Sequence, residues 1–327
     1  MAGPSESLPS ASQVNLLAVA GATACGKTRL GVELARHLSG EIISADSRQV
    51  FRGLDLGTGK DLHDYGSVPY HLIDIVDPKT EFSVFDFQEH CYQAIKNIQH
   101  RGNLPCLVGG SGLYLESVLL GYRMVAVPEN PDLRRELESF SDAQLRERLT
   151  GLKTQLHNVT DFGSRARLIR AIEIAQVQAE TIPPEPMNLN ALVLGIHWPR
   201  VELRQRIRQR LEARLKQGLI EEVQNLLAQG VSHQRLESLG LEYRWVSHYL
   251  RGAMDTVALV EGLSCAIAQF AKRQETWFRR MERRGVAIVW LAGGDQLPER
   301  AMKICAEIEW SHAPKRPHPI VIPPSKN

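Results

Sequence analysis

The amino-acid sequence predicts an α/β protein: a P-loop NTPase-like parallel sheet core with helices on both faces and an inserted helical lobe. Short apolar runs alternate with helical segments early in the chain and return near its end, which is typical of a parallel sheet covered on both faces. Between them, a polar stretch with helical periodicity interrupts the alternation. Hydrophobic residues make up 43% of the 327 positions and charged residues 23%, which excludes a disordered or collagen-like chain.

The first strand, loop and helix form a phosphate-binding P-loop. The apolar run 16–20 precedes a glycine-bounded loop, and the spacing of Leu30, Leu34 and Leu38 predicts a helix after it. Glycines let backbone N–H groups surround phosphate oxygens at a helix N-terminus, Lys27 adds a cation, and the Thr28 hydroxyl can bind Mg²⁺. The predicted phosphate ligands are Gly21, Ala22, Thr23, Ala24, Cys25, Gly26, Lys27 and Thr28.

The remaining elements follow from hydrophobic periodicity in chain order. Strands are expected where short apolar runs lie between turn residues, and helices where apolar residues recur every three or four positions. The expected strands are 41–45, 70–74, 105–108 and 192–196, the expected helices 85–101, 165–177, 201–228 and 256–281, and the last apolar run is 286–291.

Proline-rich boundaries divide the chain. Prolines near 128–131 and 183–186 bracket the polar, helical stretch. The expected organisation is a disordered leader (1–13), a discontinuous P-loop α/β catalytic core (14–124 and 191–310), a helical insertion (125–190) and a mobile Pro-rich tail (311–327).

The cysteines and the N-terminus bear on cellular location. The five cysteines form no C-x-x-C pair, which indicates neither a disulfide framework nor a zinc site. No signal peptide and no apolar run of about 18 residues is visible. The sequence therefore predicts a cytoplasmic protein without a membrane partner.

Asp46 follows the expected strand 41–45, at the edge where parallel sheets bind ligands. It is a candidate general base, although Asp in such a loop can also simply form a turn. A kinase P-loop usually has an acidic Mg²⁺ ligand at a later strand end, whereas 107–111 supplies glycines and a serine there. This disfavours phosphoryl transfer but leaves a small-molecule kinase using ATP as an alternative.

Seven stretches together resemble the tRNA dimethylallyltransferase (tRNA isopentenyltransferase) family, and the match runs from about 14 to 290. They are GATACGKT at 21–28, ADSRQVF at 45–51, GTGK at 57–60, HLID at 71–74, VGGSGLY at 108–114, RLIRAIE at 167–173 and AKRQETWFR at 271–279. The resemblance implies transfer of a dimethylallyl group from dimethylallyl diphosphate to the exocyclic amine of the adenine adjacent to the anticodon on its 3′ side. It implies Mg²⁺ as cofactor, the tRNA anticodon stem-loop as partner, and a monomer of the bacterial-type short form without a zinc finger.

The resemblance also assigns catalytic roles. The adenine amine is a poor nucleophile, so Asp46 is expected to accept its proton as general base. Arg210, which follows Arg206 and Ile207 in the family's Arg-Ile-x-x-Arg run, is expected to stabilise the leaving diphosphate. Thr23 occupies a family position that faces the reacting centre.

The tRNA surface is expected to combine basic helix faces with unpaired-base contacts. Basic residues outnumber acidic ones in 200–216 and 272–284, although such runs can be solvated helix faces. Arg167 and Arg170 are i,i+3 neighbours, and Gln49 could read an adenine edge. The predicted tRNA-binding residues are Asp46, Ser47, Arg48, Gln49, Ser111, Arg134, Ala166, Arg167, Leu168, Ile169, Arg170, Tyr243, Arg244, Lys272, Arg273, Gln274, Trp277 and Arg279.

The sequence departs from the family pattern at three places. Phe51 replaces a common Tyr, Glu242 interrupts a run in which Gly directly precedes Tyr-Arg, and Ile267-Ala268 replaces Thr-Arg. None of these is a predicted catalytic residue. A non-enzymatic RNA-binding protein that keeps the fold is a further alternative, against which the intact Lys27, Asp46 and Arg210 argue.

Overall fold

The computed structural model describes residues 13–152 and 164–311, which form two compact units. The core unit contains the described residues up to Leu120 and from Asn188 onward, and the insertion unit those between Gly121 and Met187. The predicted insertion, 125–190, differs from these limits by a few residues at each end. Apart from Gln13 and Ser311, the predicted leader and tail lie outside the described residues.

One parallel sheet organises the core unit, in the strand order β3-β2-β4-β1-β5-β6. This confirms the predicted parallel α/β core. β1, β2 and β4 are buried along their whole length, which is why their sequences are predominantly apolar. The strands are β1 (Leu16–Gly21), β2 (Gly40–Ala45), β3 (Tyr70–His71), β4 (Leu104–Gly109), β5 (Ala191–His197) and β6 (Val289–Ala292).

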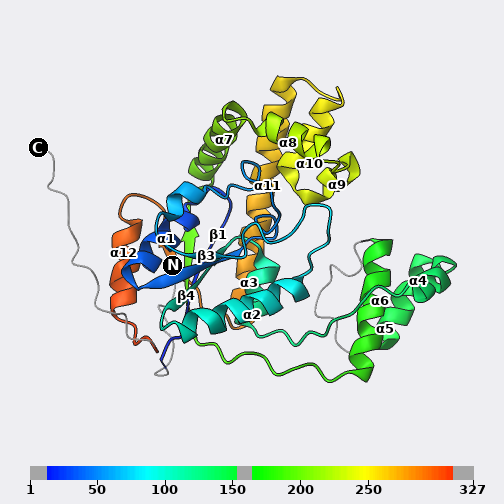
Figure 1. Cartoon of the computed structure of the whole chain (residues 1–327), viewed down its shortest axis with the longest axis horizontal. Helices are drawn as coiled ribbons and strands as arrows, with labels where there is room; N and C mark the ends of the chain where they lie inside the picture. The colour runs from blue at the N-terminus through cyan, green and yellow to red at the C-terminus, as the bar shows by residue number, and fades with distance from the viewer. Residues whose placement is uncertain (1–12, 153–163, 312–327) are drawn as a thin grey trace, which may run out of the picture. The chain divides into compact units, whose positions relative to one another are not determined.

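Helices cover both faces of this sheet (Figure 1). α1 (Lys27–His37) and α12 (Leu297–Ala306) contact each other and pack on one face, whereas α2 (Val84–His100) and α3 (Gly112–Leu119) pack on the other. β1, β2 and β4 end at the same edge, because Ala20 and Ala45 both pair with Gly109. The P-loop follows β1 at this edge.

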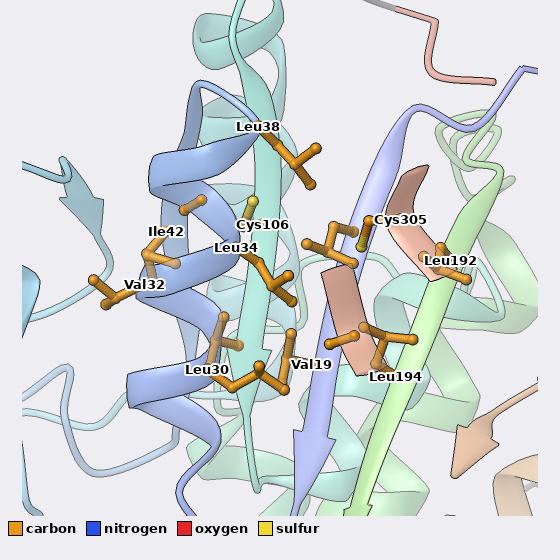
Figure 2. Packing of buried hydrophobic residues seen from close by; sticks show 14 of the residues in the cluster. Val19, Leu30, Val32, Leu34, Leu38, Ile42, Cys106, Leu192, Leu194 and Cys305 are labelled. Carbon is orange, nitrogen blue, oxygen red and sulfur yellow. The ribbon is translucent and has the colours of Figure 1, made fainter. Parts of the chain in front are cut away.

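α1 is held on the sheet by a dense apolar core (Figure 2). Leu30 and Leu34 pack in the cluster that contains Val19 of β1 and Leu194 of β5. Burying each leucine contributes about 1.5–3 kcal/mol. Gly31 lets the helix approach β4, since a Cβ there would lie 2.6 Å from a methyl of Val108. This packing fixes the helix N-terminus that carries the P-loop.

A second helical layer packs on the P-loop itself. Figure 1 shows α7 to α10 gathered around one end of α11. Their apolar core includes Ala22 and Ala24 of the P-loop and Val50 and Phe51 after β2. The helices are α7 (Arg200–Lys216), α8 (Leu219–Ala228), α9 (His233–Leu239), α10 (Leu241–Leu250) and α11 (Thr256–Arg283).

Two predicted elements were wrong in extent. The expected strand 70–74 stops at His71, because Leu72 (φ 63°) and Asp74 (φ 58°) adopt left-handed backbone conformations. The expected helix 201–228 is two helices, since Gly218 between α7 and α8 has φ 106°. α9, α10 and α12 were not predicted from the sequence.

The insertion unit is a small helical body with its own apolar core. Its helices are α4 (Pro131–Glu138), α5 (Asp142–Leu152) and α6 (Arg165–Glu180). Leu137, Leu145, Leu149 and Leu168 are fully buried within it. Among the helices of both units as far as the structure describes them, none is long and apolar enough to cross a membrane.

Candidate active site

A pocket of about 550 Å³ opens at the carboxyl edge of the sheet in the core unit. Its walls come from the P-loop, the turn after β2, the loop 57–61, and the helices α7, α10 and α11. Ligands of open α/β sheets bind at this edge. Thr23, Lys27, Asp46 and Arg210, which the sequence predicted to act together, all line this one pocket.

The P-loop presents backbone and hydroxyl groups to the pocket. Gly26 has φ 94° and caps the N-terminus of α1, whose first residues, Lys27 and Thr28, line the pocket. The first N–H groups of a helix have no intrahelical partner and carry the positive end of its dipole. Cys25 is buried instead, and a Cβ on Gly21 would lie 2.5 Å from its Sγ. The loop is therefore shaped to bind an anion.

α7 is tied to the P-loop by two arginines spaced one helical turn apart. Arg210 donates a hydrogen bond to the Thr23 hydroxyl. Arg206 Nε donates to Ala24 O (3.0 Å), and its guanidinium lies 4.3 Å from the Trp198 ring centroid. Burial and the nearby Arg214 lower the pKa of Arg210 to about 10, so it remains a cation at neutral pH. Arg210 thus adds a cation to the pocket beside the P-loop, in addition to Lys27.

One carboxylate oxygen of Asp46 stabilises the turn after β2, and the other is available to act in a reaction. Its Oδ1 accepts a hydrogen bond from the Arg48 N–H (2.9 Å), the turn-forming role considered from the sequence. Its Oδ2 forms no hydrogen bond to other residues in the described parts of the chain. The next residue is fixed too, because the Ser47 N–H donates to Ser111 Oγ (2.9 Å). The carboxylate is therefore held in place with one oxygen available.

Two predicted RNA contacts, Gln49 and Gln274, are used inside the protein. The Gln49 amide accepts from Ser44 Oγ (2.8 Å) and donates to Gly59 O (3.1 Å). The Gln274 amide accepts from the Thr23 N–H (2.9 Å) and donates to Gly110 O (2.8 Å). Both ends of the Gln49 amide are engaged within the protein, but Gln49 also lines the pocket, so the expectation that it reads an adenine edge stays a prediction. Gln49 and Gln274 position the pocket walls.

Tyr243, another predicted RNA contact that lines the pocket, is also engaged inside the protein. It is only 1% exposed, and its hydroxyl donates to Glu222 Oε1 (2.8 Å). The Glu222 carboxylate also accepts the N–H groups of Asp55 (3.1 Å), Leu56 (2.6 Å) and Gly57 (3.1 Å). Tyr243 and Glu222 therefore hold the chain that leads into the wall loop 57–61.

Lys60 anchors the other end of this loop. It is 1% exposed and donates to Asp55 Oδ1 (2.7 Å), Phe51 O (2.8 Å) and the Asp74 carboxylate. Asp74 reaches it because the chain turns away from the sheet after β3. A buried cation with two carboxylate partners fixes the loop strongly.

The predicted RNA residues on α11 and α10 divide into exposed and buried groups. Lys272, Arg273 and Arg279 are exposed, as is Arg244, whose guanidinium donates to Glu237 O. Trp277 is packed internally: its indole N–H donates to Glu116 Oε2 (2.7 Å) and the Arg280 guanidinium lies 4.9 Å from its ring. A Cβ on Gly112 would lie 2.4 Å from the same ring. Trp277 is thus a structural residue of this wall.

In the insertion unit, Glu173 forms ion pairs with two arginines that the sequence predicted to contact RNA. Arg134 Nε (2.8 Å) and Arg170 (2.8 Å) both donate to the Glu173 carboxylate, which is 2% exposed and also accepts the Asn130 N–H. Burial alone would raise the pKa of Glu173, but these hydrogen bonds lower it to about 2. Arg134 and Arg170 are therefore ion-paired with a buried carboxylate, and their contact with RNA stays a prediction.

The other predicted residues on α6 differ in exposure. The side chain of Leu168 is fully buried in the core of the insertion unit, so any contact of this residue with RNA would be made by its backbone. Ile169 is half-buried, whereas Ala166 and Arg167 are exposed. Arg167 is the residue of this group whose side chain best fits the predicted role.

Several pocket residues were missed from the sequence, among them Arg206 and Glu242. Arg214 was missed too; it contacts the wall residue Asp61 without lining the pocket itself. Arg206 and Arg214 flank Arg210 at four-residue spacing, a signal present in the basic run 200–216. Arg214 is 5% exposed and donates to Asp61 (3.2 Å). Glu242, one of the departures, also lines the pocket; burial raises its pKa, while Arg210 and Arg214 oppose that shift.

Comparison with known proteins gives consistent matches. The family model described as IPP transferase matches residues 49–281. A tRNA dimethylallyltransferase 1 of Geotalea uraniireducens is 57% identical over 286 residues, covering 87% of this chain and 95% of that protein. A tRNA dimethylallyltransferase 2 of Syntrophotalea carbinolica is 60% identical over 287 residues, covering 86% and 96%.

Solved structures agree with the sequence matches. The tRNA isopentenylpyrophosphate transferase of Bacillus halodurans superposes with a TM-score of 0.66 at 32% identity, covering 90% of this chain and 96% of that one. A eukaryotic dimethylallyltransferase acting on tRNA superposes with a TM-score of 0.73, covering 93% and 83%. At 22% identity, the latter supports the fold alone.

Proposed function

This chain belongs to the IPP transferase family, and from that membership we propose that it is a tRNA dimethylallyltransferase. It transfers a dimethylallyl group from dimethylallyl diphosphate to the exocyclic amine of the adenine adjacent to the anticodon on its 3′ side. The observation that carries this proposal is the single pocket in which an anion-binding P-loop, two cations and a carboxylate with a free oxygen meet. The relatives compared here give no support to a small-molecule kinase.

The donor half of the pocket suits a diphosphate. As the allylic C–O bond breaks, its electron pair leaves with the diphosphate, whose charge grows. The P-loop, Lys27 and Arg210 all line the pocket and would stabilise that charge. The hydrogen bond from Arg210 to Thr23 holds the arginine in place before the donor arrives. These groups bind the donor and stabilise its leaving group.

Thr28 fits the proposed Mg²⁺ cofactor. Its hydroxyl lines the pocket at the start of α1, and no cluster of three or more His, Cys, Asp or Glu side chains suited to a metal occurs in the described ranges. Mg²⁺ usually keeps several waters and binds through few protein groups together with substrate phosphates. The Thr28 hydroxyl would hold the ion together with the diphosphate. The ion would neutralise charge on the leaving group.

The acceptor half depends on Asp46. The exocyclic amine must lose a proton as its nitrogen bonds to the allylic carbon, and the free Oδ2 of Asp46 can accept it. An adenine inside a stacked loop cannot reach such a pocket, so it must be extruded. The wall loop 57–61, held by Glu222, Gln49 and Lys60, is a fixed boundary for that base.

Exposed cations support an RNA-binding role for both units. On α11, Lys272, Arg273 and Arg279 are solvent-exposed, and Arg273 lines the pocket. On α6, Arg167 is exposed. Such residues set RNA affinity through phosphate contacts rather than through base identity. The enzyme is proposed to act as a monomer.

The proposal is tested by incubating the protein with unmodified tRNA, dimethylallyl diphosphate and Mg²⁺, followed by mass analysis of the nucleosides. We expect a dimethylallyl adenosine at the position after the anticodon and its loss when Mg²⁺ is chelated. A parallel reaction with ATP in place of the donor should consume no ATP. Turnover of ATP without modified adenosine would favour the kinase alternative.

A further inference from the structure

One face of α11 forms a wall of the pocket. Ile267, Phe270, Arg273 and Gln274 line it at helical spacing. Gln274 binds the P-loop through the Thr23 N–H, so this end of the wall is at the donor site. Phe270 is four residues away, which is about 6 Å along the helix axis. Phe270 therefore lies about one helical turn along α11 from the residue that contacts the donor site.

Phe270 is exposed although it is a large apolar side chain. Among the described residues, the aromatic side chains that line this pocket are Tyr243 and Phe270. Tyr243 is 1% exposed and bonded to Glu222, whereas Phe270 is 38% exposed. The Arg273 guanidinium lies 5.9 Å from the Phe270 ring centroid. An exposed ring beside a cation in a substrate pocket is available to a ligand.

We infer that Phe270 is a stacking platform for an unpaired RNA base next to the reacting adenine; the inference rests on the proposed function. Unpaired bases are recognised by stacking on aromatic rings and guanidinium planes, and Phe270 with Arg273 offers both. The exposed Lys272 and Arg273 match the charge of an RNA backbone at the same place. Trp277, the aromatic residue singled out from the sequence, is engaged by Glu116 and Arg280 and does not serve this role.

The inference is tested by the affinity of an anticodon stem-loop for Phe270 variants. Phe270→Ala should weaken binding roughly ten-fold or more, with the salt dependence unchanged, because stacking releases no counterions. Phe270→Tyr should bind as the parent does. Phe270→Leu should behave as Phe270→Ala, because it keeps apolar bulk but has no ring. Val257→Ala is the matched control, since Val257 is 65% exposed on the same helix and does not line the pocket.

The stacked base is identified with a double-mutant cycle. Stem-loops with one abasic position each are bound to the parent and to Phe270→Leu, and coupling is calculated for each position. We expect the loss of one particular base to weaken parent binding and to have no further effect in Phe270→Leu. Retained pyrophosphate binding in each variant shows that the pocket is intact.

Two outcomes would overturn the inference separately from the proposed function. If the parent transfers the allyl group and Phe270→Leu binds RNA as tightly as the parent, the platform does not exist. Absence of coupling at every loop position would lead to the same conclusion. If the parent neither binds the stem-loop nor modifies it, the proposed function itself fails and the inference fails with it.

Discussion

Arg210 of α7 donates a hydrogen bond to the hydroxyl of Thr23 in the P-loop. This contact joins segments that are 187 residues apart in the sequence and positions a cation beside the P-loop, where Lys27 supplies another. Because the pKa of Arg210 is lowered only to about 10, the guanidinium remains protonated at neutral pH. The donor site therefore has its positive charge in place before the substrate binds.

Arg210→Ala and Lys27→Ala should each slow allyl transfer by about 10²–10³-fold at saturating substrates, because each removes a donor aimed at developing charge. Single-turnover rates with bound tRNA measure this effect. Arg204→Ala is the control, since Arg204 is exposed on the same helix and does not line the pocket. A change confined to the KM for tRNA would assign Arg210 to the RNA surface.

Glu222→Gln should damage the acceptor side of the pocket and leave the donor side intact. The carboxylate accepts three backbone N–H groups and the Tyr243 hydroxyl, and a glutamine would direct an NH₂ group at some of these donors. We expect lower kcat/KM for tRNA, unchanged pyrophosphate affinity, and a loss of unfolding free energy of about 1–3 kcal/mol. Tyr243→Phe should lower the kcat/KM for tRNA and the unfolding free energy less than Glu222→Gln does. Glu221→Gln is the control: Glu221 is the exposed neighbouring residue, so this variant should keep the kcat/KM and the unfolding free energy of the parent.

Acid should destabilise the insertion unit through Glu173. Its pKa is about 2 in the folded state and near 4.5 when unfolded, so its stabilising contribution is present above pH 4.5. That contribution is lost as the pH falls toward 2. Hydrogen exchange of α6 in the whole protein should accelerate in this range. Glu173→Gln should remove that pH dependence, whereas Glu180→Gln, at the exposed end of α6, should retain it. If hydrogen exchange of α6 in Glu173→Gln accelerated as steeply with falling pH, a group other than Glu173 would be responsible.

Arg167 and Arg170 should differ although they are one helical turn apart. Arg167→Ala should weaken tRNA binding and reduce the slope of log affinity against log salt by about one, because a phosphate contact releases counterions. Arg170→Ala should instead destabilise the insertion unit, because it removes a partner of the buried Glu173. An unchanged slope and affinity for Arg167→Ala would mean that this arginine is only part of a solvated helix face.

Features set by local sequence could be predicted. The P-loop depends on a strand, a glycine-bounded loop and a helix that are contiguous in the chain, and Asp46 follows directly from the end of β2. Arg210 could be assigned only through the family resemblance, since its contact with Thr23 is long-range. The end of the strand at His71 could not be predicted, because hydrophobic periodicity does not report backbone angles such as the positive φ of Leu72 and Asp74.

Side-chain partners distant in sequence could not be predicted. Arg134 meets Glu173 across 39 residues, a contact that its place in the family pattern does not reveal. The spacing of Arg167 and Arg170 that suggested phosphate contacts is equally compatible with the ion pair between Arg170 and Glu173. Gln49 and Gln274 carry donors and acceptors that suit a base edge, but backbone groups of Gly59 and Gly110 use them. Motif matching finds such residues without distinguishing substrate contact from support of the wall.

The central claim is that Asp46 takes the proton from the adenine amine while the P-loop holds the donor diphosphate. The most direct measurement is the single-turnover yield of modified adenosine, quantified by nucleoside mass analysis, for the parent and Asp46→Asn at saturating tRNA and dimethylallyl diphosphate. We expect rapid transfer by the parent, a rate about 10²–10⁴-fold lower for Asp46→Asn, and equal pyrophosphate affinity for both. Absence of modified adenosine with the parent, or near-equal rates for the two proteins, would contradict the account.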